Sequence, residues 1–241
     1  MFYTVLPLPA RWGSDVTRVA RWAPLVGLGL GAIAAGSYLG LAALGCPPLT
    51  RSVLIVALSW RLTGGLHLDG AIDTADGLAV GDPARRLAVM QDSRTGAFGV
   101  MAALAIALLK VAALRELAPR VVLWVLPAAA AWGRWGQVVA IARYPYLKPT
   151  GKGAWHQRSF RQPQDLLLST VTVLGFAALH LALAPDPGPV LGLHSSGSLL
   201  ALGLGFSLHR RLGGHTGDTY GAIVEWSEAL LLAVGATLWP G

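Results

Sequence analysis

Two short stretches hold eight of the twelve acidic residues in this 241-residue chain. Asp69, Asp73 and Asp76 are spaced i, i+4 and i+7, which on a helix places their side chains on one face within an arc of about 60°. Carboxylates held this close repel one another unless a cation lies among them. The spacing therefore predicts a metal site made by these three aspartates. The other acids of the two stretches are Asp82, Asp92, Asp218, Glu225 and Glu228.

The ligand type favours magnesium as the metal. Mg²⁺ prefers carboxylate oxygens, retains water ligands and bridges to substrate phosphates. Zinc sites usually contain cysteine or histidine, and the single cysteine, Cys46, leaves no multi-cysteine site. The alternative is a solvated acidic helix end, which is the usual meaning of a run of charges. The glycines threaded through HLDGAIDTADGLAVGD weaken that alternative, because they let the backbone approach a ligand closely.

Asp82 and Asp92 each have two interpretations. Asp82 precedes Pro83, which is typical of a helix N-cap followed by a proline at the first helical position, but it could equally bind the metal. Asp92 could cap a helix that begins near Gly96, or it could act in catalysis. In the same DSRTG run, Arg94 stands where it could bind a substrate phosphate.

The second acidic stretch, GGHTGDTYGAIVEWSEALLL, joins a glycine-rich turn to an apolar helix. Gly214 and Gly217 leave backbone N–H groups accessible, so we expect them to cradle a phosphate. Glu225 enters the apolar helix, where an ionised group costs about 3 kcal/mol at the bilayer centre and is by default functional.

A basic loop, RYPYLKPTGKGAWHQRSFR, contains five cations interleaved with aromatic residues. It has two interpretations: contact with lipid headgroups, or capture of a nucleotide with cations such as Arg143 and Lys152 on its phosphates. Within the apolar segments, we expect Arg134 to face the active cavity and Lys110, near a helix end, to snorkel to the interface. His215 is either a base or merely a polar residue.

The composition indicates where these residues must lie. Only 13% of the side chains are charged, 54% are hydrophobic and the mean hydropathy is +0.56, which is too apolar for a soluble domain. About seven apolar stretches approach the roughly 20 residues that cross a bilayer, which leaves no room for a separate soluble domain. We therefore predict an all-α, polytopic membrane helical bundle of about six to seven transmembrane helices, with residues 1–241 forming a single integral membrane domain. The expected spans run over residues 24–45, 52–66, 96–114, 121–142, 166–184, 190–208 and 222–239.

The first two expected spans have distinctive sequences. The first contains GLGLGAIAAG, and small residues at this density predict close packing against another helix rather than a nucleotide-binding loop. The second is short and contains Arg61. We expect it to tilt, to re-enter or to thin the bilayer locally.

The positive charges predict an orientation in the membrane. With the N-terminus inside, the cytoplasmic segments contain thirteen Lys and Arg residues, and the opposite side has only Arg51, Arg115 and Arg120. We expect the N-terminus and both acidic stretches to face the cytoplasm from the cytoplasmic (inner) membrane. The net charge of +7 is then explained by attraction of anionic lipid and an anionic substrate to the cytoplasmic face. No nucleic-acid partner is expected.

Three runs resemble the cobalamin synthase family, and the resemblance covers nearly the whole chain: TGGLHLDGAIDTADGL (63–78), DSRTGAFG (92–99) and LGGHTGDTYGAIVEWSEALLL (212–232). It implies a multi-pass membrane enzyme that needs Mg²⁺. It also implies that adenosylcobinamide-GDP is joined to α-ribazole or its 5′-phosphate, giving adenosylcobalamin or its 5′-phosphate and releasing GMP. By motif match, the family's acidic positions are occupied here by Asp69, Asp73, Asp76, Asp92, Asp218 and Glu225.

The chain departs from the family pattern at Ala71, His215 and Trp226, and its loop over 144–153 is longer and more basic. These departures affect specificity more than chemistry, and they weigh against a catalytic His215. In the mechanism that the resemblance implies, Mg²⁺ on the three aspartates bridges the pyrophosphate while the ribazole hydroxyl attacks the phosphorus on the corrinoid side. We expect one of Asp92, Asp218 and Glu225 to accept the hydroxyl proton as the catalytic base. A hydrophobic intermediate, or an assembly with other enzymes of cobalamin synthesis, would explain the membrane location.

Two other functions fit parts of the sequence. A CDP-alcohol phosphotransferase that makes phospholipid also uses aspartates on membrane helices, but the Ala-Arg expected two residues after its first Asp-Gly is missing here. A cation-coupled transporter would use the acids as an ion relay, which requires carboxylates near mid-membrane. The acids here cluster at the expected cytoplasmic ends of the helices, which favours the transferase.

Overall fold

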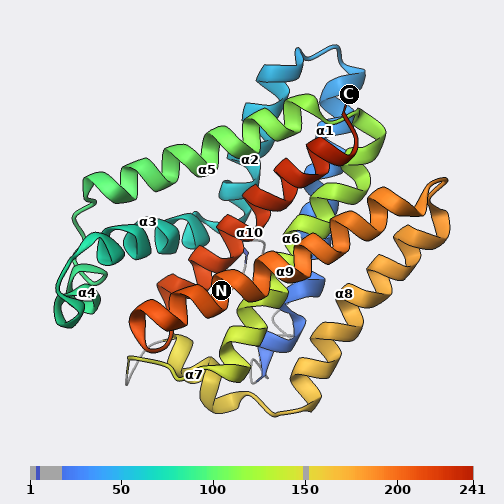
Figure 1. Ribbon diagram of the computed structural model, residues 1–241. Coiled ribbons are helices and arrows are strands. Elements are labelled where there is room, and N and C mark those ends of the chain that lie inside the picture. Colours follow the sequence, from blue (N-terminus) through green and yellow to red (C-terminus); the bar gives the residue numbers. More distant parts are fainter. Residues whose placement is uncertain (1–3, 6–17, 149–151, 241) are drawn as a thin grey trace.

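The structure, a computed structural model, describes residues 4–5, 18–148 and 152–240. Over these residues the chain is helical and contains no β-strand, which confirms the predicted all-α class (Figure 1). The helices are η2 (Val19–Trp22), α1 (Ala23–Ala43), α2 (Pro48–Thr63), α3 (Leu66–Ala79), α4 (Pro83–Val89), α5 (Ala97–Glu116), α6 (Pro119–Arg143), α7 (Lys152–Ser159), α8 (Gln164–Leu183), α9 (Pro187–Leu212) and α10 (Gly217–Leu238).

Every expected span coincides with a long helix, namely α1, α2, α5, α6, α8, α9 or α10. Within the described ranges, five segments are long and apolar enough to cross a membrane: Val19–Ala43, α5, α8, α9 and α10. Helix α2 has only 16 residues, in keeping with the short span expected there. Helix α6 has 25 residues and carries Arg134 and Gln137, but both are buried by its neighbours. A helix covered in this way does not need an apolar surface toward lipid.

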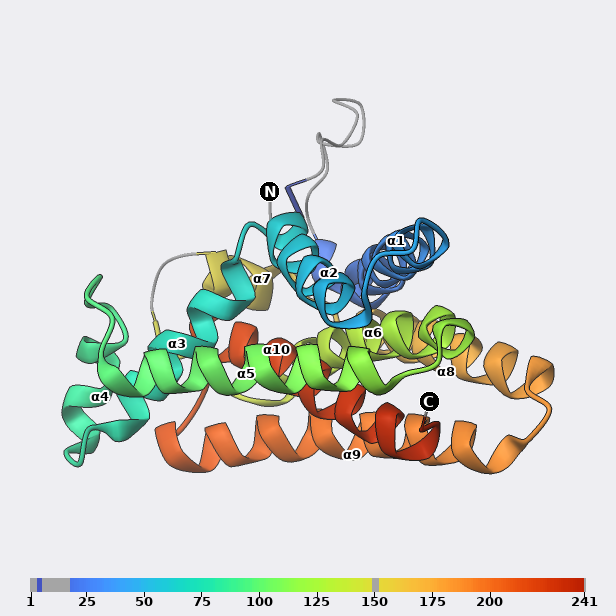
Figure 2. The same cartoon turned by 90° about the horizontal axis from the view of Figure 1, so that it is seen from above.

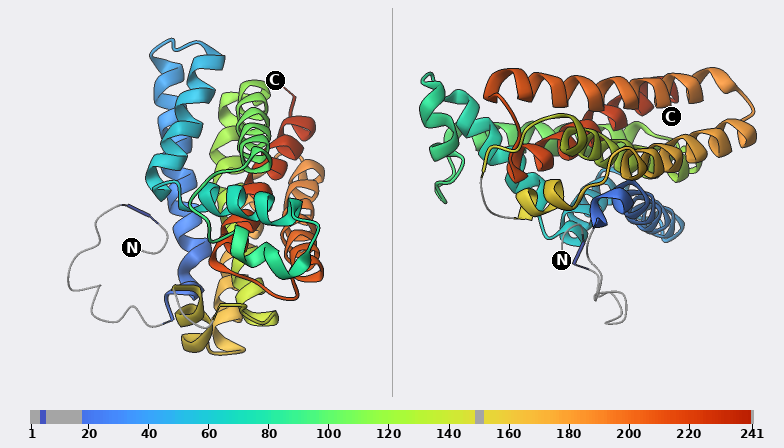
Figure 3. Two further views of the ribbon diagram at one scale, coloured as in Figure 1. Left: turned by 90° about the vertical axis from the view of Figure 1, so that its left-hand side faces the viewer. Right: turned by 90° about the horizontal axis from the view of Figure 1, so that it is seen from below.

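Helices α6 and α10 form the centre of the bundle. Figures 2 and 3 show the α1–α2 pair on one side of them and α9 on the other. The largest hydrophobic core lies among α1, α6 and α10, where Tyr38, Val125 and Leu231 are fully buried. Lipid tails are as apolar as these side chains, so close packing holds the helices together more than exclusion from water does.

The packing of α1 on α6 depends on two glycines of the GLGLGAIAAG run. A Cβ atom on Gly27 would lie 2.5 Å from the carbonyl oxygen of Ala130, and one on Gly31 would lie 2.5 Å from the Cα atom of Pro127. Gly29, between them, has no neighbour within 4 Å of such an atom. The prediction that this run packs against another helix is therefore confirmed.

The two ends of the bundle differ. The short helices α3, α4 and α7 lie at one end with the turn between α9 and α10, as Figures 1 and 2 show. The turns between α1 and α2, α5 and α6, and α8 and α9 lie at the other end with the C-terminus. We call the first one the acidic end, because it contains Asp69, Asp73, Asp76, Asp92 and Asp218.

Helix α3 changes direction from α2 at two consecutive glycines. Gly64 and Gly65 have φ angles of 65° and 72°, in the left-handed region that side chains disfavour. Gly64 also ends α2, where its N–H donates to the carbonyl oxygen of Arg61 over 3.2 Å. The turn lets α3 leave the line of α2 and pack against α5 and α10.

Candidate active site

Helix α3 crosses the start of α10 with the two backbones in contact. A Cβ atom on Gly70 would lie 2.5 Å from the carbonyl oxygen of Asp218, and one on Gly221 would lie 2.9 Å from that of His67. Helices approach this closely where small residues face each other. The crossing brings the first turn of α10, with Asp218, into the electrostatic environment of the aspartates on α3.

The pKa of Asp73 is changed by this environment. Loss of hydration raises the pKa of Asp73 to about 6, and the negative charges of Asp69 and Asp218 add to the rise. Asp76 contributes in the same direction, whereas the positive charge of Lys148 opposes it. The three aspartates that share one face of α3 therefore act together with Asp218, although that residue is about 150 positions away in the sequence.

Lys148 brings a positive charge to these acids. Its Nζ atom donates to Oδ2 of Asp218 over 2.9 Å, and the hydroxyl of Thr216 donates to the same oxygen over 3.2 Å. A parallel β-bridge between Tyr146 and His215 ties the basic loop to the turn before α10. The bridge thus holds Lys148 beside the acidic face.

Lys148 is the residue that sequence reasoning missed. The sequence shows that its loop is basic, but the spacing along the chain does not reveal which cation the β-bridge brings to Asp218. Of the two cations that were singled out, Arg143 ends α6 with an exposed side chain. Lys152 begins α7, and its side chain lies outside the described residues.

Asp76 also anchors the start of α5. Its Oδ2 accepts the N–H of Gly96 and its Oδ1 accepts the N–H of Gly99, each over 2.7 Å. The first N–H groups of a helix lack partners within the helix and carry partial positive charge, so they favour a carboxylate there. Each oxygen of Asp76 retains a lone pair that a cation could use.

Asp92 pairs with Arg94 in the loop between α4 and α5. Their Oδ2 and Nη2 atoms are 2.6 Å apart, and Oδ1 of Asp92 accepts the backbone N–H of Arg94 over 3.0 Å. Hydrogen bonds from Arg94 lower the pKa of Asp92 to about 2, which makes it a weak base. Asp76, rather than Asp92, supplies the acceptors for the start of α5. Asp82 does cap a helix, because it accepts the N–H of Ala84 over 3.0 Å at the start of α4.

The donors at the acidic end suit a divalent cation. Carboxylate oxygens are the ligands that Mg²⁺ prefers, and here they come from α3 and from the first turn of α10. In the described part of the chain, no three Asp, Glu, His or Cys side chains converge into a ready-made metal cage. The raised pKa of Asp73 is the observation that favours a cation, because a positive charge would offset both the lost hydration and the repulsion from Asp69 and Asp218 that raise it.

The histidines near this site are buried and neutral. Burial lowers the pKa of His215 to about 4, and its Nδ1 atom lies 3.0 Å from the hydroxyl of Thr219. Burial and then the positive charge of Arg134 lower the pKa of His67 to about 3. Neither histidine would take up a proton near neutral pH, so the structure favours a packing role for both.

Gly214 and Gly217 lie in the turn that precedes α10. A Cβ atom on Gly214 would lie 2.5 Å from the carbonyl oxygen of Pro145, so close packing on the basic loop accounts for this glycine. Gly217 is the exposed first residue of α10, where helix N–H groups favour a phosphate. The phosphate cradle therefore stays a prediction, centred on Gly217.

Four charged side chains form a buried network about two turns deeper along α10. The Nζ atom of Lys110 lies 2.6 Å from Oε2 of Glu225 and 2.8 Å from Oε2 of Glu228. Nη1 of Arg134 lies 2.7 Å from Oε1 of Glu228, and the indole of Trp60 donates to Glu225 over 3.3 Å. Two carboxylates thus face two cations, and the network is neutral.

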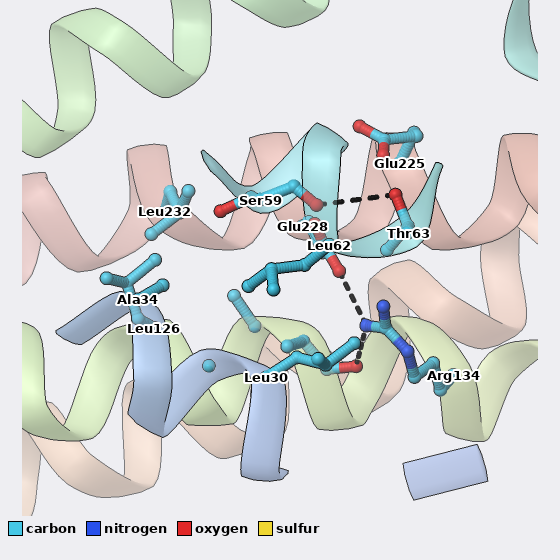
Figure 4. Close-up of a pocket in the computed structure, with 13 residues that line it drawn as sticks. Leu30, Ala34, Ser59, Leu62, Thr63, Leu126, Arg134, Glu225, Glu228 and Leu232 are labelled. Atoms are coloured by element: carbon cyan, nitrogen blue, oxygen red, sulfur yellow. Dashed lines mark hydrogen bonds and ion pairs between the residues drawn. The ribbon is translucent and has the colours of Figure 1, made fainter. Parts of the chain in front are cut away.

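This network corrects the sequence analysis at Lys110. The side chain is buried in ion pairs, so the prediction that it snorkels to the interface is wrong. Arg134 does line a cavity, shown in Figure 4 with Leu30 and Leu126 on its walls. The cavity volume is about 30 Å³, which is room for one or two water molecules and not for a nucleotide. None of the aspartates of the acidic end lines the cavity beside Arg134.

Comparison with known proteins identifies relatives along the whole chain. The model of the family described as cobalamin-5-phosphate synthase matches residues 1–236. A relative from Trichormus variabilis, named adenosylcobinamide-GDP ribazoletransferase, is 53% identical and aligns over 97% of this chain and 93% of its own length. A relative of the same name from Synechocystis sp. is 50% identical over 96% of this chain and 90% of its own. No solved structure matches.

Proposed function

The chain belongs to the cobalamin-5-phosphate synthase family, and on that basis we propose that it is a membrane-bound adenosylcobinamide-GDP ribazoletransferase. It transfers the adenosylcobinamide-phosphate group to α-ribazole or its 5′-phosphate, forms adenosylcobalamin or its 5′-phosphate, and releases GMP. The structural observation that supports this most is the crossing of α3 and α10. It gathers four aspartates and Lys148 at one end of the bundle, as transfer of a phosphate-linked group requires.

Mg²⁺ is the metal that we propose for the acidic end. Asp69 and Asp73 would hold it, together with the lone pairs of Asp76 that the α5 amides leave unused. When bound, the ion would neutralise phosphate oxygens and stabilise the charge that develops on the leaving GMP.

The side chains of the protein position the reacting groups. Lys148 binds a phosphate oxygen of the substrate and, by moving to it, releases the carboxylate of Asp218. The ribazole hydroxyl oxygen forms a bond to the phosphorus on the corrinoid side, and the bond from that phosphorus to GMP breaks. GMP leaves with the electron pair, and Asp218 accepts the hydroxyl proton.

Asp218 is the most suitable of the three carboxylates considered as the base. Asp92 has a pKa of about 2 beside Arg94, so it holds a proton too weakly. Glu225 lies in the buried network with Lys110, about two turns from the acidic face. Asp218 alone combines proximity to the α3 aspartates with a partner, Lys148, that the substrate can displace.

The phosphates of the nucleotide have further candidate ligands at the acidic end. Arg94 has an 88% exposed side chain, and Arg143 is also exposed. We propose these two, with Lys152 of the basic loop and the N–H of Gly217, as contacts for the GDP portion. Arg134 is not among them, because it is buried against Glu228.

Five long apolar helices make this a multi-pass membrane protein. We propose that it lies in the cytoplasmic membrane with its N-terminus and acidic end toward the cytoplasm. The distribution of arginines supports this orientation by the positive-inside rule. Among the described residues, the arginines at the acidic end include Arg85, Arg86, Arg94, Arg143, Arg210 and Arg211, and those at the opposite end are Arg51, Arg115 and Arg120.

Turnover by the purified, detergent-solubilised protein tests the proposed reaction. The protein is given adenosylcobinamide-GDP with α-ribazole or, separately, with its 5′-phosphate, and GMP and corrinoid products are followed by chromatography. Equal amounts of GMP and cobalamin product are expected. Release of CMP from a CDP-lipid by a preparation that leaves the corrinoid unchanged would instead identify a phospholipid-synthesising phosphotransferase.

A further inference from the structure

The end of the bundle opposite the acidic end contains a larger cavity, of about 590 Å³. It lies between the start of α6, the end of α8, the start of α9 and the C-terminal residues, a region visible at the upper right of Figure 1. Its polar and aromatic lining comes from Arg120, Trp124, His180, Asp186 and Trp239. None of these residues takes part in the proposed reaction.

The aromatic side chains of this cavity form a layered stack. The ring of His180 lies 4.6 Å from that of Trp124 with 5° between their planes, and 6.0 Å from that of Trp239 with 24° between them. Stacked rings from α6, α8 and the C-terminus fix the shape of the cavity wall. Tryptophan is also the side chain most typical of the boundary between hydrocarbon and water.

A chain of hydrogen bonds determines which proton His180 carries. The indole N–H of Trp132 can only donate, and it donates to Nδ1 of His194 over 3.0 Å. Neutral His194 therefore carries its proton on Nε2, which lies 3.2 Å from Nδ1 of His180. His180 must accept at Nδ1, so its own proton is on Nε2. No described residue accepts this N–H, which leaves the cavity with a hydrogen-bond donor.

Arg120 gives the cavity a guanidinium group that no described carboxylate pairs with. Arg120 forms no ion pair with a described residue, whereas Arg115 at the same end pairs with Glu116 over 3.4 Å. The carboxylate of Asp186 also lines the cavity and caps α9 by accepting the N–H of Gly188 over 2.9 Å, so it offsets the charge of Arg120 without forming an ion pair with it. The cavity therefore offers a guanidinium and an imidazole N–H together, and both are donors to an anion.

We propose that this cavity binds the headgroup of an anionic phospholipid. Its phosphate lies between Arg120 and the Nε2–H of His180, and its glycerol portion lies against the Trp124–His180–Trp239 stack. The acyl chains run along the neighbouring apolar surface, where Leu183 and Leu191 are 63% and 58% exposed. The two donors, the tryptophan side chains and the place at a membrane end favour a lipid over a soluble ligand.

Lipid-dependent stability of the detergent-solubilised full chain tests this site. We expect added phosphatidylglycerol to raise the melting temperature more than phosphatidylcholine does. Arg120→Gln should weaken the apparent affinity for phosphatidylglycerol about fivefold, as expected for the loss of one cation near an anionic headgroup. Arg115→Gln, which removes a cation from the same end but not from the cavity, is the matched control and should keep the wild-type response.

A second measurement makes the test independent of the melting temperature. Native mass spectrometry counts the phosphatidylglycerol molecules that each variant retains, and we expect Arg120→Gln to lose one that Arg115→Gln keeps. Equal responses to the two lipids, or equal effects of the two substitutions, would overturn the proposal. An equal stabilisation by glycerol 3-phosphate would overturn it as well, because it would identify a site for a soluble phosphate.

Discussion

Asp73 is the residue at which function and stability oppose each other. The pKa of its carboxyl is about 6 in the folded protein, above its ordinary value of 3.8. The folded state therefore holds the proton more tightly than the unfolded state does. The contribution to stability is complete below about pH 4 and is lost as the pH rises through about 6. Above that pH, the metal-free protein keeps an ionised carboxylate among other acids.

We therefore expect Asp73→Asn to raise the melting temperature of the metal-free protein at pH 8 and to change it little at pH 4. Thermal unfolding in detergent with a chelator measures the effect. Asp92→Asn is the control, because the pKa of Asp92 is lowered rather than raised and no stabilisation should follow. A melting temperature at pH 8 that falls in Asp73→Asn would contradict this description of the site.

The buried network allows a test of whether Glu225 is structural or catalytic. Lys110→Met leaves two carboxylates with one cation, and breaking a buried ion pair in this way costs about 3–5 kcal/mol. The double variant Lys110→Met/Glu225→Gln restores neutrality, so we expect it to recover most of the lost stability and to retain turnover. Denaturation and GMP release measure the two properties. A stable but inactive double variant would indicate that Glu225, rather than Asp218, is the catalytic base.

Single residues were predictable from the sequence where their neighbours are local. The i, i+4, i+7 spacing identified the acidic face of α3, and the Asp-Pro pair allowed a cap at Asp82, which the structure confirms. The partners of Lys110 and Lys148 lie more than 60 positions away along the chain. Such pairings depend on how the helices pack, and the pattern of one segment carries no information about that.

At the scale of elements, the site depends on the distance between α3 and α10. Gly70→Ala would place a Cβ atom 2.5 Å from the carbonyl oxygen of Asp218, so the helices must separate. Misplacement of a reacting group by about 1 Å can cost about 100-fold in rate, and we expect kcat/KM for GMP release to fall by about that factor. Gly36→Ala is the matched control, since nothing lies within 4 Å of its Cβ atom. Equal activities of the two variants would show that the crossing does not position the site.

The sequence predicted the existence of the elements better than their arrangement. Apolar length located all seven long helices, because the bilayer sets the length of a span. It could not show that α6 is the central helix, because the length of a span does not reveal which helices surround it. It also could not show that α3 crosses α10, because the glycines that meet there belong to segments far apart in sequence.

The orientation of the whole molecule in the membrane can be tested by chemical labelling of its single cysteine. Cys46 is partly exposed in the turn between α1 and α2, at the end opposite the acidic end. We expect a membrane-impermeant maleimide to label Cys46 from outside intact cells. In a Cys46→Ser background, Ser93→Cys in the exposed loop before α5 should react only after the membrane is opened. The reverse pattern of labelling would invert the proposed topology.

We propose that the aspartates gathered at the acidic end hold the Mg²⁺ on which the transfer depends. GMP release from adenosylcobinamide-GDP and α-ribazole, measured against Mg²⁺ concentration for wild type and Asp73→Asn, tests it most directly. We predict Mg²⁺-dependent turnover by the wild type and a loss of about 100-fold or more in the variant. Asp186→Asn, at the opposite end, should retain wild-type turnover. Wild-type rates without divalent metal, or full activity of Asp73→Asn at ordinary Mg²⁺, would contradict the account.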